Sequence, residues 1–205
     1  MPKLLLGTLN ESKITEMTSA LHEVFKNKVE IVTPADLSIK IEPEETGDTF
    51  EKNAQLKAEF YAEISGLPTI ADDGGICIEA LGGEPGVRSK RWLGYVASDD
   101  EIISYTLERL KDIPDHMRTA YFETCVCFFD PRTSNAYCET STIHGRLANS
   151  ISRTPMPHYP YRTLFIVDGM NKYYDELTGE ESQKINHRRI ATVRLARKIK
   201  PYLLQ

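Results

Sequence analysis

The spacing of hydrophobic positions along the chain predicts a series of strands and helices. Short apolar runs predict strands, and apolar residues that recur every three or four positions predict amphipathic helices. In the helix expected from Asn10 to about Phe25, for example, Ile14, Met17 and Leu21 share one stripe. The predicted strands span residues 3–8, 29–33, 118–129, 136–145 and 164–167, and the predicted helices span 10–25, 49–65, 99–111 and 187–201.

The connections between these elements indicate the fold class. Residues 118–129 and 136–145 alternate between apolar and polar positions across a short loop, which is typical of a β-hairpin. The earlier strands are instead separated by helices, which is typical of crossover connections. The pattern therefore predicts an α/β protein with a mixed β-sheet flanked by helices.

One polar segment interrupts the apolar pattern. Asp72, Asp73, Gly74 and Gly75 lie between two apolar runs and predict a tight turn between two strand-like pieces. Two adjacent carboxylates near a core cost several kcal/mol unless something compensates their charge. A hard cation such as Mg²⁺, which prefers carboxylate oxygens, would do so. These residues alone leave a structural turn and a metal site both open.

Composition and charge exclude several classes of protein. The chain has 205 residues, of which 40% are hydrophobic, and this suits one sizeable α/β domain. A net charge of −5 without a basic tail argues against bulk nucleic-acid binding. No apolar run approaches the roughly 20 residues that span a bilayer, and the start of the chain turns polar too early for a signal peptide.

The four cysteines indicate a cytoplasmic protein. Cys77, Cys125, Cys127 and Cys138 show no Cys-x-x-Cys spacing, so we expect reduced, half-buried thiols. Cys125 and Cys127 should share one face of a strand. A zinc site is the alternative, although no His stands at ligand spacing from them.

Four further segments suit a phosphorylated ligand. They are residues 8–13 at a strand-to-helix junction, the acidic loop and helix of 44–58, the Gly-rich loop and cations of 82–92, and the basic helix start at 186–189. Free N–H groups at a helix N-terminus bind phosphate. A basic helix start opposes the helix dipole, and an anionic ligand would relieve that conflict. The alternative for each segment is an ordinary capped helix or a solvated charged loop.

Taken in order, these motifs resemble the inosine triphosphate pyrophosphatase family over nearly the whole chain. The motifs are Thr8 to Lys13, Glu-Glu-Thr-Gly through Lys-Ala at 44–58, Ala-Asp-Asp-Gly-Gly at 71–75, Leu-Gly-Gly-x-Pro-Gly-Val at 81–87, Ser-x-Arg at 89–91 and Asn-His-Arg at 186–188. The resemblance implies one domain over residues 1–205, with an elongated mixed sheet and two lobes around a central cleft. It also implies a homodimer that uses Mg²⁺ to hydrolyse noncanonical purine nucleoside triphosphates to a monophosphate and pyrophosphate.

The resemblance also implies roles for individual residues. Asp73 would be the general base, and Glu45, Asp72 and Asp73 would bind the metal. The residues that would hold the triphosphate are Thr8, Asn10, Lys13, Lys57, Gly74 and Arg91. The residues that would contact the base and sugar are Tyr159, Tyr161, Arg162, His187 and Arg188.

The base-recognition half departs from the family pattern. Arg162 replaces an Asp, and an Arg can donate but cannot accept hydrogen bonds. Ser182 stands where the family has a Lys. The resemblance therefore indicates the reaction type more directly than it indicates the preferred base. A nucleotide-binding protein without turnover and a pyrophosphatase for another modified triphosphate are the alternatives.

Overall fold

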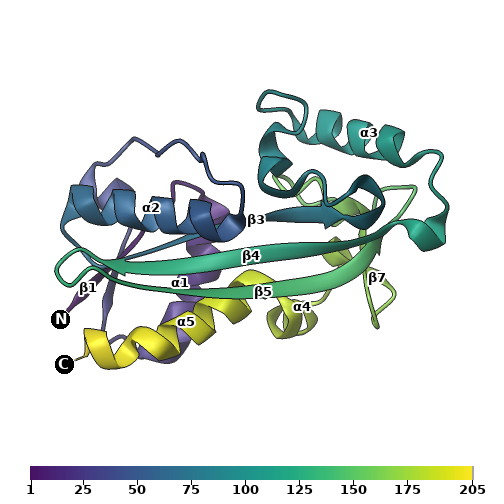
Figure 1. Ribbon diagram of the computed structural model, residues 1–205. Coiled ribbons are helices and arrows are strands. Elements are labelled where there is room, and N and C mark those ends of the chain that lie inside the picture. Colours follow the sequence, from purple (N-terminus) through teal and green to yellow (C-terminus); the bar gives the residue numbers. More distant parts are fainter. Residues whose placement is uncertain (205) are drawn as a thin grey trace. The chain divides into compact units, whose positions relative to one another are not determined.

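The chain divides into two compact units. Figure 1 shows the computed structural model, which describes residues 1–204. The first unit contains Met1–Gly74, Thr124–Ser141 and residues 187–204, and the second contains Gly75–Glu123 and Thr142–Asn186. Within the described residues, no helix combines the length and the apolar character needed to cross a membrane.

A mixed seven-stranded sheet runs through the chain in the order β2-β1-β3-β4-β5-β6-β7. Its strands are β1 (Lys3–Leu6), β2 (Glu30–Val32), β3 (Thr69–Ile78), β4 (Thr119–Asp130), β5 (Asn135–Leu147), β6 (Phe165–Val167) and β7 (Lys172–Tyr173). β1 pairs in parallel with β2 and β3, whereas β6 pairs antiparallel with β5 and β7. The predicted mixed α/β sheet is confirmed, while the elongated shape and the cleft stay predictions.

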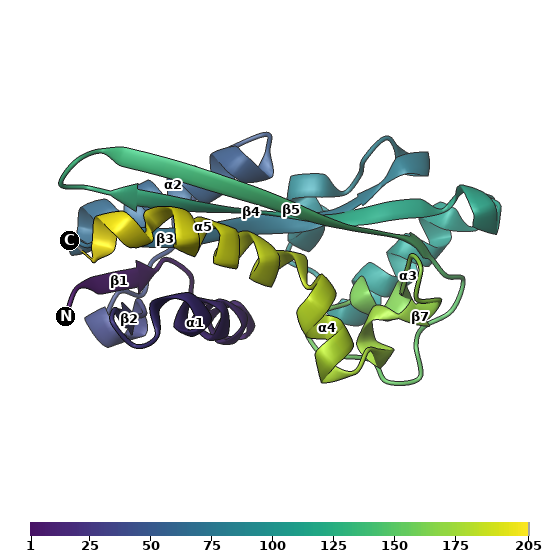
Figure 2. The same cartoon turned by 90° about the horizontal axis from the view of Figure 1, so that it is seen from below.

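Helices cover both faces of the sheet in the first unit. α1 (Glu11–Phe25) and α5 (His187–Leu203) pack together on one face, and α2 (Phe50–Ser65) covers the other (Figures 1 and 2). Alternation along β1 matches this arrangement: Leu4 and Leu6 join the core with α1 and α5, and Leu5 packs against Tyr61 of α2. All three leucines are therefore buried, as expected for a strand covered on both sides.

The starts of α1 and α2 agree closely with the sequence pattern, because each is fixed by a local side-chain cap. Asn10 Oδ1 accepts from the backbone N–H of Lys13 at 3.1 Å, and Thr49 Oγ1 accepts from that of Lys52 at the same distance. Thr178 and Glu181 form the capping box of α4 (Gly179–Ile185).

The predicted turn at the aspartate pair is wrong. β3 continues from Thr69 to Ile78 straight through Asp72 and Asp73. The strand can remain unbroken because cationic side chains approach the two carboxylates, as described below. Gly75 suits close packing and not a turn: a Cβ there would collide with Ser89 Oγ and lie 2.7 Å from Gly86 O.

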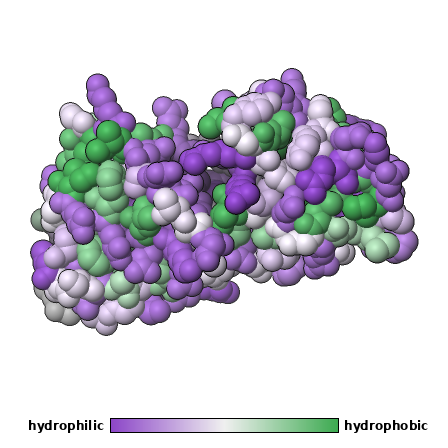
Figure 3. Space-filling view, turned by 45° about the horizontal axis from the view of Figure 1, so that its top comes forward, coloured by the Kyte–Doolittle hydropathy of each residue, from purple (hydrophilic) through white to green (hydrophobic). Residues whose placement is uncertain are grey.

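The second unit has its own hydrophobic core. It contains α3 (Asp99–Leu110), α4 and the paired strands β6 and β7. Phe122, Phe165 and Tyr174 form an aromatic group at the centre of this core, with the two phenylalanine ring centroids 4.8 Å apart. Hydrophilic side chains dominate the face of the molecule in Figure 3, and hydrophobic residues form separate patches on it.

The cysteine expectation is wrong in two respects, the first being that Cys77, Cys125 and Cys127 are buried and not half-buried. Cys127 and Cys138 form a disulfide between β4 and β5, so they are not reduced thiols. The pairing depends on the register of the hairpin, which places Cys127 of β4 beside Cys138 of β5. The sequence pattern does not reveal this register. The shared face of Cys125 and Cys127 is confirmed, since their sulfur atoms lie 3.8 Å apart.

Candidate functional site

The predicted phosphate-binding junction and the aspartate pair lie on neighbouring strands of the first unit. β1 is the middle strand of β2-β1-β3, and the helices that follow β1 and β2 cover opposite faces of the sheet. Ligands of open α/β sheets bind beyond the carboxyl ends of strands at such a reversal. The backbone N–H of Gly7 donates to Ile70 O at 2.7 Å, which joins the end of β1 to β3 just before Asp72.

Asp72 faces the side of the sheet that α1 and α5 cover. Its Oδ2 lies 3.0 Å from Lys13 Nζ and accepts from Arg188 Nε at 2.9 Å. The carboxylate is completely buried, which by itself would raise its pKa, but the two cations outweigh burial and hold the pKa well below its usual range. Its Oδ1 is buried and has no hydrogen-bond partner among the described residues. Asp72 is therefore an ionised anchor for two cations.

The basic start of α5 is balanced by acidic side chains of the chain itself. Arg188 NH1 donates to Glu16 on α1 at 2.6 Å, in addition to its bond with Asp72. Burial alone would lower the pKa of Arg188, but the two carboxylates raise it. The neighbouring Arg189 pairs with Glu23. The sequence suggested that an anionic ligand would compensate these cations, which oppose the helix dipole. In the structure, carboxylates of the chain itself compensate them.

Asp73 faces the opposite side of the sheet, toward α2, because neighbouring strand residues point to opposite faces. Its Oδ2 accepts from Asn53 Nδ2 at 3.1 Å, and its Oδ1 lies 3.8 Å from Lys57 Nζ. The same ammonium group donates to Glu45 Oε1 at 2.7 Å. Burial raises the pKa of Asp73 above its usual value, and Lys57 only partly offsets this. Two carboxylates thus converge on one cation.

The two lysines respond differently to burial. Burial lowers the pKa of Lys13 to about 8, although Asp72 acts in the opposite direction. Burial also disfavours the charge of Lys57, but the carboxylates of Asp73, Asp72 and Glu45 outweigh it and raise the pKa. At neutral pH both lysines carry positive charge beside the aspartate pair.

Sequence reasoning assigned no role to two residues of this site. Asn53 Oδ1 accepts from the backbone N–H of Gly47 at 2.7 Å, so Asn53 joins the acidic loop to Asp73. It precedes Lys57 by one helical turn, which places both on the same face of α2. Glu16 is the partner of Arg188. It follows Lys13 by one turn of α1, so helical spacing from Lys13 could have indicated that it lies on the same face.

The other predicted residues of the first unit surround this group. Thr8 is buried, and its Oγ1 accepts from the backbone N–H of Asn10 at 3.2 Å, which shapes the loop that enters α1. Gly74 follows Asp73 in β3 and is half-buried. His187 is buried at the start of α5, next to Arg188.

The remaining predicted residues belong to the second unit. Arg91 is exposed at the end of a 3₁₀ helix over Gly86–Arg91. Tyr161 is buried and donates from its hydroxyl to Ser89 O at 2.8 Å.

Arg162 lies in an aromatic stack of the second unit. Its guanidinium carbon lies 3.8 Å from the ring centroid of Tyr159 and 4.7 Å from that of Tyr174. The Arg162 side chain is buried, and cation–π contacts of this kind favour a fixed ring position. The geometry therefore favours a role for Arg162 in positioning Tyr159.

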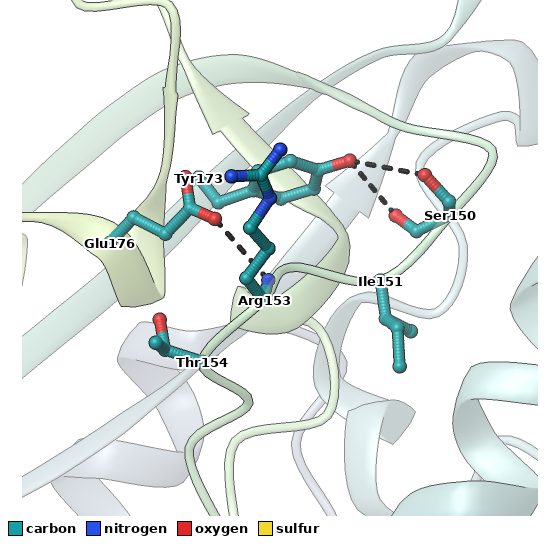
Figure 4. A pocket seen from close by; sticks show the side chains of 6 residues that line it. All are labelled: Ser150, Ile151, Arg153, Thr154, Tyr173 and Glu176. Carbon is teal, nitrogen blue, oxygen red and sulfur yellow. Dashed lines mark hydrogen bonds between the residues drawn. The ribbon is translucent and has the colours of Figure 1, made fainter.

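The second unit also contains a hollow of about 600 Å³. Six residues line it: Ser150, Ile151, Arg153, Thr154, Tyr173 and Glu176 (Figure 4). Glu176 accepts from the backbone N–H of Arg153 at 3.3 Å, and the Tyr173 hydroxyl donates to Ser150 O at 3.1 Å. None of the residues predicted from sequence lines this hollow, so we do not assign it to the candidate site.

The site in the first unit is suited to hydrolysis of a phosphate anhydride. Asp73 is a buried carboxylate with a raised pKa, which suits a general base. Lys13 and Lys57 supply positive charge that would stabilise the charge of a leaving phosphate group. The N-terminus of α1 adds a favourable end of a helix dipole.

Comparison with known proteins agrees with this chemistry. The model of the Ham1 family matches residues 4–198. The chain belongs to the Ham1 family. Among its relatives, the dITP/XTP pyrophosphatase of Shigella flexneri is 39% identical over 191 residues, covering 92% of this chain and 93% of that protein. The dITP/XTP pyrophosphatase of Elusimicrobium minutum is also 39% identical, covering 97% of this chain and 100% of that protein.

Solved structures of the family share the fold. A HAM1 protein from Coxiella burnetii superposes with a TM-score of 0.84 at 28% identity, covering 98% of this chain and 100% of that one. The dITP/XTP pyrophosphatase of Mycobacterium abscessus gives a TM-score of 0.76 at 31% identity, covering 94% of this chain and 98% of that one.

Proposed function

We propose that this Ham1 family protein hydrolyses noncanonical purine nucleoside triphosphates such as dITP, XTP and ITP. The products are the nucleoside monophosphate and pyrophosphate. The observation that carries the proposal is Asp73, a buried carboxylate with a raised pKa held by Asn53 beside Lys57. Relatives named dITP/XTP pyrophosphatase support the substrate class.

The acidic residues of the site fit a divalent cation, which we propose is Mg²⁺. Glu45 and Asp73 offer carboxylate oxygens that converge on Lys57 on the α2 side of β3. Asp72, the third predicted ligand, points to the other side of the strand, where its Oδ1 is buried without a partner among residues 1–204. We therefore propose that Glu45 and Asp73 are the residues that would hold the cation. Carboxylate oxygens are the ligands that Mg²⁺ prefers. When bound, the metal supplies positive charge that polarises the phosphoryl oxygens.

The side chains of the site supply the other steps of the reaction. Asp73 accepts the proton of the attacking water at a carboxylate oxygen, and Asn53 holds that carboxylate in position. Lys13 and Lys57 bind the phosphate chain and stabilise the negative charge that gathers on pyrophosphate as it leaves. Asp72 keeps Lys13 and Arg188 in place through buried ion pairs.

Pyrophosphate release from a panel of nucleotides tests this function. The panel contains ITP, XTP, dITP, the standard nucleotides and modified pyrimidine triphosphates, each with Mg²⁺. We expect the highest kcat/KM with the noncanonical purines. Tight nucleotide binding without release on any substrate would instead identify a binding protein without turnover, and a preference for a modified pyrimidine would change the substrate class.

The pH dependence of kcat/KM should have two limbs. Asp73 must be deprotonated to accept a proton, so activity rises with pH through its pKa, which burial raises above the usual value. Lys13 must be charged to bind phosphate, so activity falls through its pKa of about 8. Lys13→Arg should move the alkaline limb upward because a guanidinium keeps its proton. An alkaline limb at the same pH in this variant would show that another group titrates there.

Arg162→Met should raise KM for all purine substrates alike and leave their ranking unchanged. The reason is that Arg162 stacks on Tyr159, so loss of its charge removes about 0.5–2 kcal/mol of cation–π energy that holds the ring. Steady-state kinetics with ITP, XTP and GTP provide the measurement, and Arg153→Met, at an exposed arginine of the loop that precedes Arg162, is the control. A changed ranking would mean that Arg162 reads the base, as the sequence comparison suggested.

The oligomeric state and cellular location stay predictions. We propose a homodimer on the basis of the family resemblance, and a cytoplasmic location on the basis of the cysteine pattern. Sedimentation equilibrium of the purified chain tests the assembly. We expect a mass twice that of the 23.3 kDa protomer. Fractionation of cells that express the protein tests the location.

A further inference from the structure

Three cysteines form a sulfur cluster in the first unit that the proposed reaction does not use. Cys125 and Cys127 are two positions apart on β4 and share a face of the strand, and Cys138 is bonded to Cys127 from β5. The three sulfur atoms all lie within 4.8 Å of one another. Cys125 and Cys127 are buried, and Cys138 is partly exposed, which gives the cluster one route to solvent.

We propose that these three cysteines, when reduced, form a binding site for the soft monovalent cation Cu(I). Thiolates are the ligands that Cu(I) prefers, and three of them complete a trigonal site. Structural zinc sites in proteins are almost always four-coordinate. Among residues 1–204, no His or carboxylate joins the three sulfur atoms as a fourth ligand. The sulfur ligands suit Cu(I), and the ligand number of three favours Cu(I) over a four-coordinate structural zinc.

The disulfide is the metal-free, oxidised form of the same cluster. Reduction by a phosphine transfers two electrons to the sulfur–sulfur bond between Cys127 and Cys138. The phosphine leaves as its oxide with oxygen from water, and the two protons of that water go to the two sulfur atoms. Cu(I) then displaces the protons of all three thiols into solvent. No electron is transferred in this second step, so the copper stays monovalent.

The cluster lies against the helix that carries two residues of the candidate site. Cys127 Sγ is 3.8 Å from the backbone oxygen of Glu51, in the first turn of α2. Asn53 and Lys57 follow on the same helix. The metal would thus bind beneath α2, on the same face of the sheet as Asp73 and separate from the oxygen ligands proposed for Mg²⁺.

Competition with a chromogenic Cu(I) chelator tests the proposal. The full chain is reduced with a phosphine, kept without oxygen and titrated with Cu(I) in the presence of the chelator. We expect the reduced protein to withhold one equivalent of Cu(I) and the oxidised protein to withhold none. Withholding by the oxidised form, or none by the reduced form, would overturn the proposal.

Two variants and a matched control make the test specific to the cluster. Cys125→Ser and Cys138→Ser should each weaken Cu(I) binding by at least about tenfold, since loss of even an outer-shell group costs about 10–100-fold. Cys77→Ser is the control, because it removes a buried cysteine of the second unit. This variant should bind Cu(I) with the affinity of the wild type. Circular dichroism checks that each variant is folded. Cys138→Ser should disturb the core least, because Cys138 is partly exposed. Wild-type affinity in both cluster variants would refute the site.

Discussion

Asp73→Asn is expected to lower kcat for noncanonical purine triphosphates by about 10²–10⁴-fold, the usual contribution of a positioned general base. The amide cannot accept the proton of the attacking water, yet it has nearly the same size as the carboxylate. Asn53 should therefore still contact position 73, and the fold and much of the nucleotide affinity should remain. Steady-state pyrophosphate release gives kcat, and equilibrium binding of the nucleotide gives the affinity.

Asp48→Asn is the matched control for this variant. Asp48 lies in the same unit, but it is exposed and pairs with a solvated lysine, Lys52, one turn away. The same carboxylate-to-amide change there should leave kcat within about twofold of the wild type, because exposed ion pairs contribute little. If Asp73→Asn keeps most of the wild-type kcat, Asp73 is not the base. If both variants lose activity together, the effect does not come from proton transfer.

Arg188→Met is expected to lower the free energy of unfolding by about 3–5 kcal/mol, the usual cost of removing one partner from a buried ion pair. The guanidinium contacts the fully buried carboxylate of Asp72 at 2.9 Å and Glu16 at 2.6 Å. Removing it leaves Lys13 as the remaining direct ion-pair partner of Asp72 among the described residues. Urea unfolding monitored by circular dichroism measures the loss.

Arg189→Met is the control for this second variant, since Arg189 stands next to Arg188 and pairs with the half-exposed Glu23. It should cost no more than about 1 kcal/mol. The double variant Asp72→Asn/Arg188→Met should lose less than the sum of the two single variants, because it removes the buried charge together with its partner. Additive losses, or equal losses in the two arginine variants, would contradict a buried ion pair as the cause.

Features that depend on neighbouring residues could be predicted from the sequence. Asn10 and Thr49 cap their helices through backbone groups three positions away, so α1 and α2 start where the pattern predicted. Apolar periodicity likewise gave the hairpin of β4 and β5 and the mixed α/β class. The order of short motifs was specific enough to indicate the family that the comparison later confirmed.

Features that depend on contacts between distant segments could not be predicted and are seen only in the folded chain. The aspartate pair resembled a turn because adjacent carboxylates and glycines disfavour a buried strand. Arg188 lies 116 positions from Asp72 and Asn53 lies 20 positions from Asp73, and these partners compensate the carboxylates within an unbroken strand. Local sequence carries no sign of such pairings, so it could not predict that Asp72 and Asp73 face opposite sides of the sheet.

The same reason explains the cysteines and Arg162. The sulfur cluster depends on the register between β4 and β5, and the aromatic stack around Arg162 depends on Tyr174, which lies beyond β7. The sequence identified the chemical groups of this protein and their order along the chain. Only packing decided which of them touch, because charge compensation and ring stacking act across space and not along the sequence.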